Sequence, residues 1–293
     1  MKIQDPCLSC LVRQTVQVAD MTLLDNKKRP ALYREMFRTL SEMDFNEPAP
    51  VPFGKIFRIA ADAVGCDDPY REIRTACDQL MLSILPDLRL QISKSEDPLQ
   101  TALRLAAAGN VIDYSIPASL TTDKILDTMR QAAEKPFVLD DSARLCREIR
   151  AARSLMLIGD NCGEIVLDKL LAETCLAVNP DLTIFYVVRG APVINDVTEE
   201  EAHTVGMDAF ATVLNAGCPM PGMVLSACSA RCREAWLSCD VRVAKGQGNF
   251  ECLDENRAGR DLYCLLLAKC VNIADAFHVA PYSPVCSLLP AEV

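Results

Sequence analysis

The second half of the chain alternates short apolar strands with helical segments, and this alternation constrains the fold more than any other feature. The segments Ser154–Ile158, Leu182–Val188 and Val241–Ala244 are mostly apolar throughout, instead of at every second residue. Strands of this kind are typical of a parallel sheet with helices on both faces. Further strands are expected at Ala211–Leu214 and Leu262–Ala268, with helices at Gly163–Val178, Thr198–Val205 and Pro221–Leu237. The pattern predicts a three-layer α/β/α domain with a mostly parallel sheet.

The first half shows apolar residues at the three- and four-residue spacing of amphipathic helices. The expected helices are Cys7–Leu24, Arg29–Met43, Pro52–Val64, Pro69–Leu85, Pro98–Ala108 and Thr122–Glu134, and Asp140–Ala152 then leads into the first strand. The pattern changes near Pro136. We therefore predict a helical N-terminal domain over residues 1–135 and the α/β/α domain over residues 136–293.

The composition and charge of the chain disfavour several classes of binding partner. The chain of 293 residues carries a formal net charge of −10, which disfavours nucleic acid and acidic membrane surfaces. It has no apolar run of about 18 residues and no apolar core of a signal peptide, so we expect no membrane partner. Its 15 cysteines are an odd number in a long chain, which favours reduced thiols in the cytoplasm over a disulfide framework. No feature specifies an oligomeric state.

Polar residues follow the first predicted strand where it ends. Gly159 permits a tight bend, and Gly163 opens a helix whose free N–H groups face the strand edge. Between them, Asp160 and Asn161 offer hard oxygen ligands that suit Mg²⁺, Mn²⁺ or Ca²⁺ better than Zn²⁺. The alternative is that Asp160 or Asn161 only caps the helix.

Two more polar turns end later strands. Arg189-Gly190 leaves the second strand, and Asn195 and Asp196 precede an acidic helix that either residue could cap. The third turn is Lys245-Gly246-Gln247-Gly248-Asn249, whose glycines allow close backbone approach and whose lysine could meet a phosphate. The carboxyl ends of parallel strands share one edge of a sheet, and ligands bind there. We therefore predict that these turns hold a divalent metal ion and a phosphate.

Two segments of the helical half carry polar signals. Asn110 and Asp113 interrupt an apolar helix, so they either reach over the site as supporting groups or simply end the helix. Cys7 and Cys10 have the spacing of a metal knuckle or a redox pair, and helix packing explains them equally well. A closed zinc site needs four ligands, and the sequence has no second pair with this spacing.

The three turns together resemble the metal-dependent damage-control phosphatases, a family long catalogued as a domain of unknown function. The motifs are Gly-Asp-Asn-x-Gly-Glu at 159–164, Arg-Gly-x-Pro-x-Ile-Asn-Asp at 189–196 and Lys-Gly-Gln-Gly-Asn-Phe-Glu at 245–251. The segment 109–113 is also similar. Members with an N-terminal Cys-x-x-Cys look closest, matching Cys7 and Cys10.

The resemblance implies a divalent metal ion (Mg²⁺, Mn²⁺, Co²⁺ or Ni²⁺) held by Asp160, Asn161 and Asp196, with Lys245 near the phosphate. It implies hydrolysis of phosphate monoesters of small, often damaged, metabolites. Cys162 stands where the family usually has alanine, and the loop at 217–222 lacks an expected acidic residue. Because of these departures, the resemblance does not extend to the contribution of this loop to the site or to the choice of substrate.

Our hypothesis is a phosphomonoesterase in which Asp160, Asn161, Asp196 and Lys245 are catalytic. The sequence leaves open whether Asp160 or a metal-bound water molecule attacks the phosphorus atom. The residues expected to bind substrate are Gly163, Glu164, Arg189, Asn195, Gly246, Gln247, Asn110 and Asp113. One alternative is a carboxyl methyltransferase that uses S-adenosylmethionine, although no glycine fingerprint supports it. The other is a non-catalytic metal- or thiol-binding protein centred on Cys7 and Cys10. In the phosphatase hypothesis, the same two cysteines are a possible second metal site or a structural one.

Overall fold

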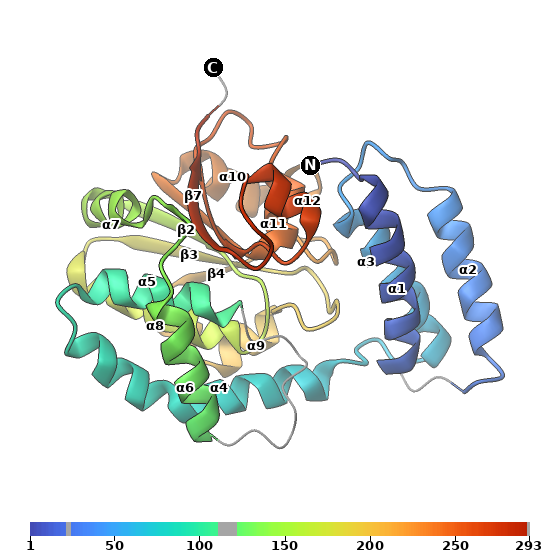
Figure 1. Ribbon diagram of the computed structural model, residues 1–293, viewed down its shortest axis with the longest axis horizontal. Coiled ribbons are helices and arrows are strands. Elements are labelled where there is room, and N and C mark those ends of the chain that lie inside the picture. Colours follow the sequence, from blue (N-terminus) through green and yellow to red (C-terminus); the bar gives the residue numbers. More distant parts are fainter. Residues whose placement is uncertain (22–24, 111–121, 292–293) are drawn as a thin grey trace.

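The computed structural model describes residues 1–21, 25–110 and 122–291. Within them a seven-stranded sheet lies between helical layers, and a group of N-terminal helices stands beside it (Figure 1). The strand order is β1-β7-β6-β5-β2-β3-β4. The strands are β1 Leu139–Asp140, β2 Ser154–Ile158, β3 Thr183–Val188, β4 Thr212–Asn215, β5 Val241–Lys245, β6 Leu262–Leu267 and β7 Pro284–Leu289.

Neighbouring strands run parallel except β6 and β7, which confirms the predicted mostly parallel sheet. The chain winds from β2 to β3 and β4 on one side and then returns to β5 on the other side of β2. The winding direction therefore reverses between β2 and β5. In open α/β sheets, the crevice at the carboxyl ends of such strands is the usual ligand site.

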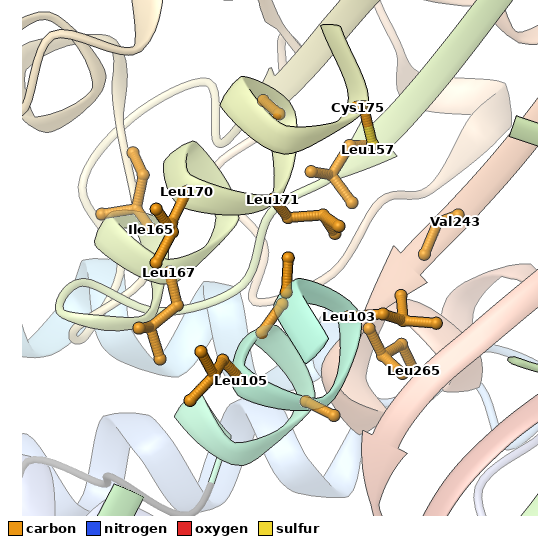
Figure 2. Packing of buried hydrophobic residues seen from close by; sticks show 14 of the residues in the cluster. Leu103, Leu105, Leu157, Ile165, Leu167, Leu170, Leu171, Cys175, Val243 and Leu265 are labelled. Atoms are coloured by element: carbon orange, nitrogen blue, oxygen red, sulfur yellow. The ribbon is translucent and has the colours of Figure 1, made fainter. Parts of the chain in front are cut away.

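The two faces of the sheet are buried under different helices. Leu155 and Leu157 of β2 join a core with α4–α9, whereas Met156 and Ile158 join a core with α10–α12. Figure 2 shows leucines of α5 and α8 packed together in the first core. The helices of these layers are α4 Arg71–Ser93, α5 Pro98–Gly109, α6 Thr122–Glu134, α7 Ser142–Ala151, α8 Glu164–Val178, α9 Glu199–Thr204, α10 Ala230–Ser238, α11 Gly246–Leu253 and α12 Val271–Ala276.

The remaining helices, which we call the N-terminal cap, have a core of their own. They are α1 Asp5–Met21, α2 Arg29–Ser41 and α3 Pro50–Val64. Val193, from the loop after β3, is fully buried in this core. Helices α4–α6 share their core with the sheet although they precede the boundary predicted at residue 135, and that boundary stays a prediction.

Several predicted helix limits were wrong. α4 continues through Pro86 to Ser93 because Leu88 and Ile92 are buried against the sheet layer. The helix predicted from Pro221 begins at Ala230 instead, where the Ser229 hydroxyl caps it. β1, β7, α11 and α12 were not predicted. No helix formed by the described residues has the length and apolar composition of a membrane span.

Candidate active site

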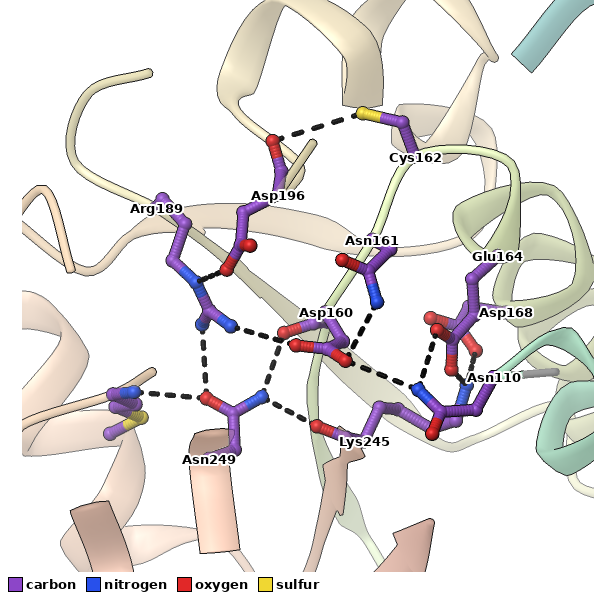
Figure 3. Close-up of polar contacts among 12 residues, drawn as sticks. Asn110, Asp160, Asn161, Cys162, Glu164, Asp168, Arg189, Asp196, Lys245 and Asn249 are labelled. Carbon is purple, nitrogen blue, oxygen red and sulfur yellow. Dashed lines mark hydrogen bonds and ion pairs between the residues drawn. The ribbon is translucent and has the colours of Figure 1, made fainter. Parts of the chain in front are cut away.

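Two loops at the carboxyl ends of β2 and β3 are joined by backbone hydrogen bonds. The Gly159 N–H donates to Val187 O at 3.0 Å, and the Val197 N–H donates to Asp160 O at 2.9 Å. Asn161 and Asp196 form an isolated antiparallel bridge between the loops. The backbone thus brings together Asp160, Asn161 and Asp196, the three residues predicted to bind the metal (Figure 3).

Arg189, the first residue after β3, ties the two aspartates together. Its side chain is fully buried, and Nε donates to Asp196 Oδ2 at 2.6 Å. Nη2 donates to Asp160 Oδ1 at 3.3 Å, and Nη1 donates to Asn249 Oδ1 at 3.0 Å. The guanidinium therefore orients both carboxylates, and its donors face protein oxygens.

A second buried cluster surrounds Lys245, the last residue of β5. Its ammonium donates to Glu164 Oε1 at 2.5 Å and to Asp168 Oδ1 at 2.6 Å, and all three side chains are fully buried. The Tyr186 hydroxyl donates to Asp168 Oδ2 at 2.9 Å. Lys245, which we predicted to lie near the phosphate, is thus engaged with carboxylates.

Asn110 connects the two clusters. It follows α5, and its Nδ2 donates to Asp160 Oδ2 and to Glu164 Oε2, each at 3.2 Å. The Leu267 N–H at the end of β6 donates to Asn110 Oδ1 at 3.3 Å. Asn110 therefore contacts Asp160 and also ends α5, so it fits both alternatives raised from the sequence, whereas Asp113 lies outside the described residues.

The predicted glycine turn at 245–249 is the start of α11, because Gly246 alone, at φ +72°, turns the chain from strand to helix. A Cβ on Gly246 would lie 1.9 Å from Asp160 Oδ2, so the backbone passes directly beside that carboxylate. Gly163 has φ +78°, and its N–H donates to Asp78 Oδ1 at 2.5 Å. The N–H group predicted to bind phosphate is therefore occupied by a carboxylate.

A cavity of about 440 Å³ opens beside the aspartates. Asp160, Asn161, Asn195 and Asp196 line it, together with Asn110 and Gln247. The lining does not include Gly163, Glu164, Arg189, Lys245 or Gly246. A larger cavity of about 670 Å³, around 46–48 and 252–259, contains none of the predicted site residues.

The N-terminal cap contributes to the same cavity through α1. Cys7 and Cys10 line it. Asn272 Nδ2 donates to Cys7 Sγ at 3.1 Å, and Arg13 and Gln14 donate to Cys10 Sγ at 3.7 and 3.6 Å. Over the described residues, no group of three or more His, Cys, Asp or Glu side chains is arranged to hold a metal ion. The thiol pair thus lies at the site, next to amide and guanidinium groups.

Electrostatics show how crowded the carboxylates are. Burial, followed by the negative charges of Asp196 and Glu164, raises the pKa of Asp160 well above its usual value, against the opposing effect of Arg189. Burial also raises the pKa of Asp196 to about 6, again opposed by Arg189. The two linked clusters place four carboxylates against two cations. When all are ionised, the excess equals the charge of one divalent ion.

The donor chemistry therefore fits a divalent metal ion. Among the groups that line the cavity, Asp160, Asp196 and Asn161 offer two carboxylates and a carboxamide, and oxygen sets of this kind suit Mg²⁺ and Mn²⁺. In Figure 3, Asn161 lies beside Asp160, and its Nδ2 donates to Asp160 Oδ2 at 2.9 Å. This bond leaves the amide oxygen of Asn161 as its potential metal ligand.

Three supporting residues were missed by the sequence reasoning. Asp168 interrupts the apolar run of α8 one turn after Glu164, and that interruption was an available signal. Asn249 lies one turn after Lys245, and its Nδ2 donates to Gly159 O at 2.9 Å. Asp78 lies on α4, and nothing in its local sequence marks it as a site residue.

Comparison with known proteins decides the family. A family model described as the damage-control phosphatase ARMT1-like domain matches residues 3–285. The chain belongs to this family. Among its relatives, a protein of Pyrococcus horikoshii named damage-control phosphatase is 28% identical over 287 residues, covering 98% of each chain. One of Archaeoglobus fulgidus with the same name is 28% identical over 277 residues, covering 94% of each.

A solved structure has the same fold as this chain. The crystal structure of a DUF89 family protein from Pyrococcus horikoshii matches with a TM-score of 0.90 and 28% identity, covering 98% of both chains. The resemblance drawn from the three motifs is thereby confirmed at the level of the family and of the α/β fold. Membership of the subgroup with an N-terminal Cys-x-x-Cys stays a prediction.

Proposed function

We propose that this chain is a divalent-metal-dependent phosphatase that hydrolyses phosphate monoesters of small metabolites. The observation that carries the proposal is the convergence of Asp160, Asn161 and Asp196 on one cavity, beside a buried group of four carboxylates that share two cations. Relatives named damage-control phosphatases support the reaction class. The cavity, at about 440 Å³, lies within the usual range for small-molecule sites.

In this proposal the metal ion is Mg²⁺, Mn²⁺, Co²⁺ or Ni²⁺, and its ligands are Asp160, Asn161 and Asp196. When bound, it neutralises charge on the phosphoryl oxygens as the P–O bond breaks. Arg189 holds Asp160 and Asp196 in position, and its positive charge favours their ionised forms. Without Arg189 the buried carboxylates would repel each other.

The remaining residues orient the phosphate and keep its surroundings fixed. Lys269 lines the cavity, and its charge lowers the pKa of Asp160, which makes it the cation we assign to the phosphate. Asn195 and Gln247 line the same cavity as hydrogen-bonding groups. We assign Lys245 an indirect role, because its ammonium fixes Glu164, which in turn holds Asn110 against Asp160.

The test compares Asp160→Asn with Asp87→Asn, an exposed carboxylate on α4 that does not line the cavity. The full chain, stripped of metal with a chelator, is assayed with p-nitrophenyl phosphate and a panel of phosphometabolites. The wild type should be inactive until Mn²⁺, Mg²⁺, Co²⁺ or Ni²⁺ is added. Loss of a metal ligand removes several kcal/mol of charge stabilisation, so Asp160→Asn should lower kcat/KM about a thousandfold or more.

The control variant should match the wild type within about twofold, since an exposed carboxylate far from the chemistry has little effect. Circular dichroism should show that both variants are folded. Activity that survives the chelator, or an Asp160→Asn variant as active as Asp87→Asn, would contradict the proposed function.

A further inference from the structure

Helix α1 gives the cavity a polar stripe that the proposed chemistry at the metal does not use. Cys10, Arg13, Gln14 and Gln17 line the cavity, and their spacing of three, four and seven residues places them on one helix face. Leu11 and Val18 of the same helix are buried in the core of the N-terminal cap. The stripe is therefore held at the cavity by the packing of the cap.

Arg13 is the cation of this stripe. Its guanidinium donates to Cys10 Sγ at 3.7 Å, and over the described residues it forms no ion pair with a carboxylate. The buried arginines near the site differ, because Arg189 binds Asp160 and Asp196, and Arg74 binds Asp68 and Glu201. In a chain with a net charge of −10, a cation that lines the cavity without a carboxylate partner can accept an anionic group from a ligand.

The cavity beside the α1 stripe has room for more than a phosphate group. At about 440 Å³ it is far larger than a phosphate group, so it has room for the leaving group of an ester as well. Gln247 lines the same cavity, and its Oε1 is buried without a hydrogen-bond partner in the described part of the chain. A buried acceptor of this kind is costly unless a ligand donor, such as a hydroxyl, satisfies it.

We propose that the α1 stripe is the subsite for the leaving group and that Arg13 selects phosphate monoesters of hydroxycarboxylic acids. The inference rests on the proposed function. The phosphate of the ester lies at Asp160, Asn161 and Asp196, and its carboxylate pairs with the guanidinium of Arg13. Arginine suits this role because its planar fork can bind both carboxylate oxygens.

The experiment measures binding without turnover, so that it does not depend on catalysis. Isothermal titration calorimetry of the Mn²⁺-loaded full chain compares 3-phosphonopropionate, 4-phosphonobutyrate and 5-phosphonopentanoate with the alkylphosphonates of matching length. The variant is Arg13→Gln, which keeps a hydrogen-bonding group and removes the charge. The matched control is Arg34→Gln, an exposed arginine of the cap that does not line the cavity.

For at least one chain length, the carboxylated ligand should bind the wild type about tenfold or more tightly than its alkyl partner, the usual gain from a charge-assisted pair. Arg13→Gln should abolish this preference and leave alkylphosphonate affinity within about twofold, while Arg34→Gln should keep the preference. Equal binding of both ligand types at every length, or a preference that survives Arg13→Gln, overturns the proposal. Failure to hydrolyse any phosphate ester would instead overturn the proposed function, because phosphonate binding is measured separately.

Discussion

The carboxylate of Asp78 should make the stability of this protein depend on pH in a way that one substitution removes. Its Oδ1 accepts the Gly163 N–H at 2.5 Å, while its Oδ2 is buried without a hydrogen-bond partner among the described residues. Burial raises the pKa of Asp78 from 3.8 to about 7, against the lowering effect of the Gly163 N–H. The folded chain therefore keeps a proton that the unfolded chain releases above about pH 4.

The sign and size of the effect follow from this difference in pKa. Between about pH 4 and pH 7 the folded state binds more protons than the unfolded state, so the free energy of unfolding falls as pH rises. A shift of about three pKa units corresponds to up to ~4 kcal/mol, of which roughly 2–3 kcal/mol develops between about pH 5 and pH 8. Asp78→Asn keeps an acceptor for Gly163 and removes the titration. Its new amide nitrogen adds a cost that does not depend on pH.

The assay is urea unfolding at several pH values between about 5 and 8, in a chelating buffer so that metal binding does not contribute. The free energy of unfolding of Asp78→Asn relative to the wild type should increase by roughly 2–3 kcal/mol across this range. Asp87→Asn, an exposed carboxylate on the same helix, should show no such trend. Parallel profiles for Asp78→Asn and the wild type would refute the reasoning.

Three further predictions concern the site. Gly246→Ala should abolish phosphatase activity, because the added Cβ would lie 1.9 Å from Asp160 Oδ2. The control is Gly65→Ala, which has a similar backbone strain but whose Cβ meets nothing within 4 Å, and equal activity of the two variants would argue against the geometry. Arg74→Met should lower the free energy of unfolding by about 3–5 kcal/mol, because it leaves the buried Glu201 without its ion pair; a urea midpoint unchanged from the wild type would count against this. Adding Mn²⁺ at about a hundred times its Kd should raise the free energy of unfolding by ~2.7 kcal/mol in the wild type and by much less in Asp160→Asn, as measured by thermal denaturation, and equal shifts would point to a different metal site.

The fold could be predicted because the signals for it are local. Strands that are apolar on both faces, such as Ser154–Ile158, identify a covered parallel sheet without any knowledge of their neighbours. β7 escaped prediction because it pairs antiparallel to β6 and is only partly buried, so its pattern is weaker. The end of α4 was misplaced because Pro86 was given more weight than the buried Leu88 and Ile92.

The convergence of the site could be predicted in part. Asp160, Asn161 and Asp196 meet because parallel strands end at one edge, a rule that needs only the order of elements. The partners of Lys245 depend on Asp168, which a different helix brings to it, and no turn motif encodes that contact. Likewise, nothing local in residues 7–17 predicts that α1 lines the cavity, because this contact joins segments about 150 residues apart in the sequence.

The central claim is that Asp160, Asn161 and Asp196 hold a catalytic divalent ion, and anomalous X-ray diffraction tests it most directly. Crystals grown with Mn²⁺ and inorganic phosphate would be measured near the manganese absorption edge. The account predicts an anomalous peak within about 2.0–2.4 Å of oxygens from all three side chains, with phosphate beside it in the cavity lined by α1. A fully occupied manganese peak elsewhere, with these three side chains bound only to protein groups, would contradict it.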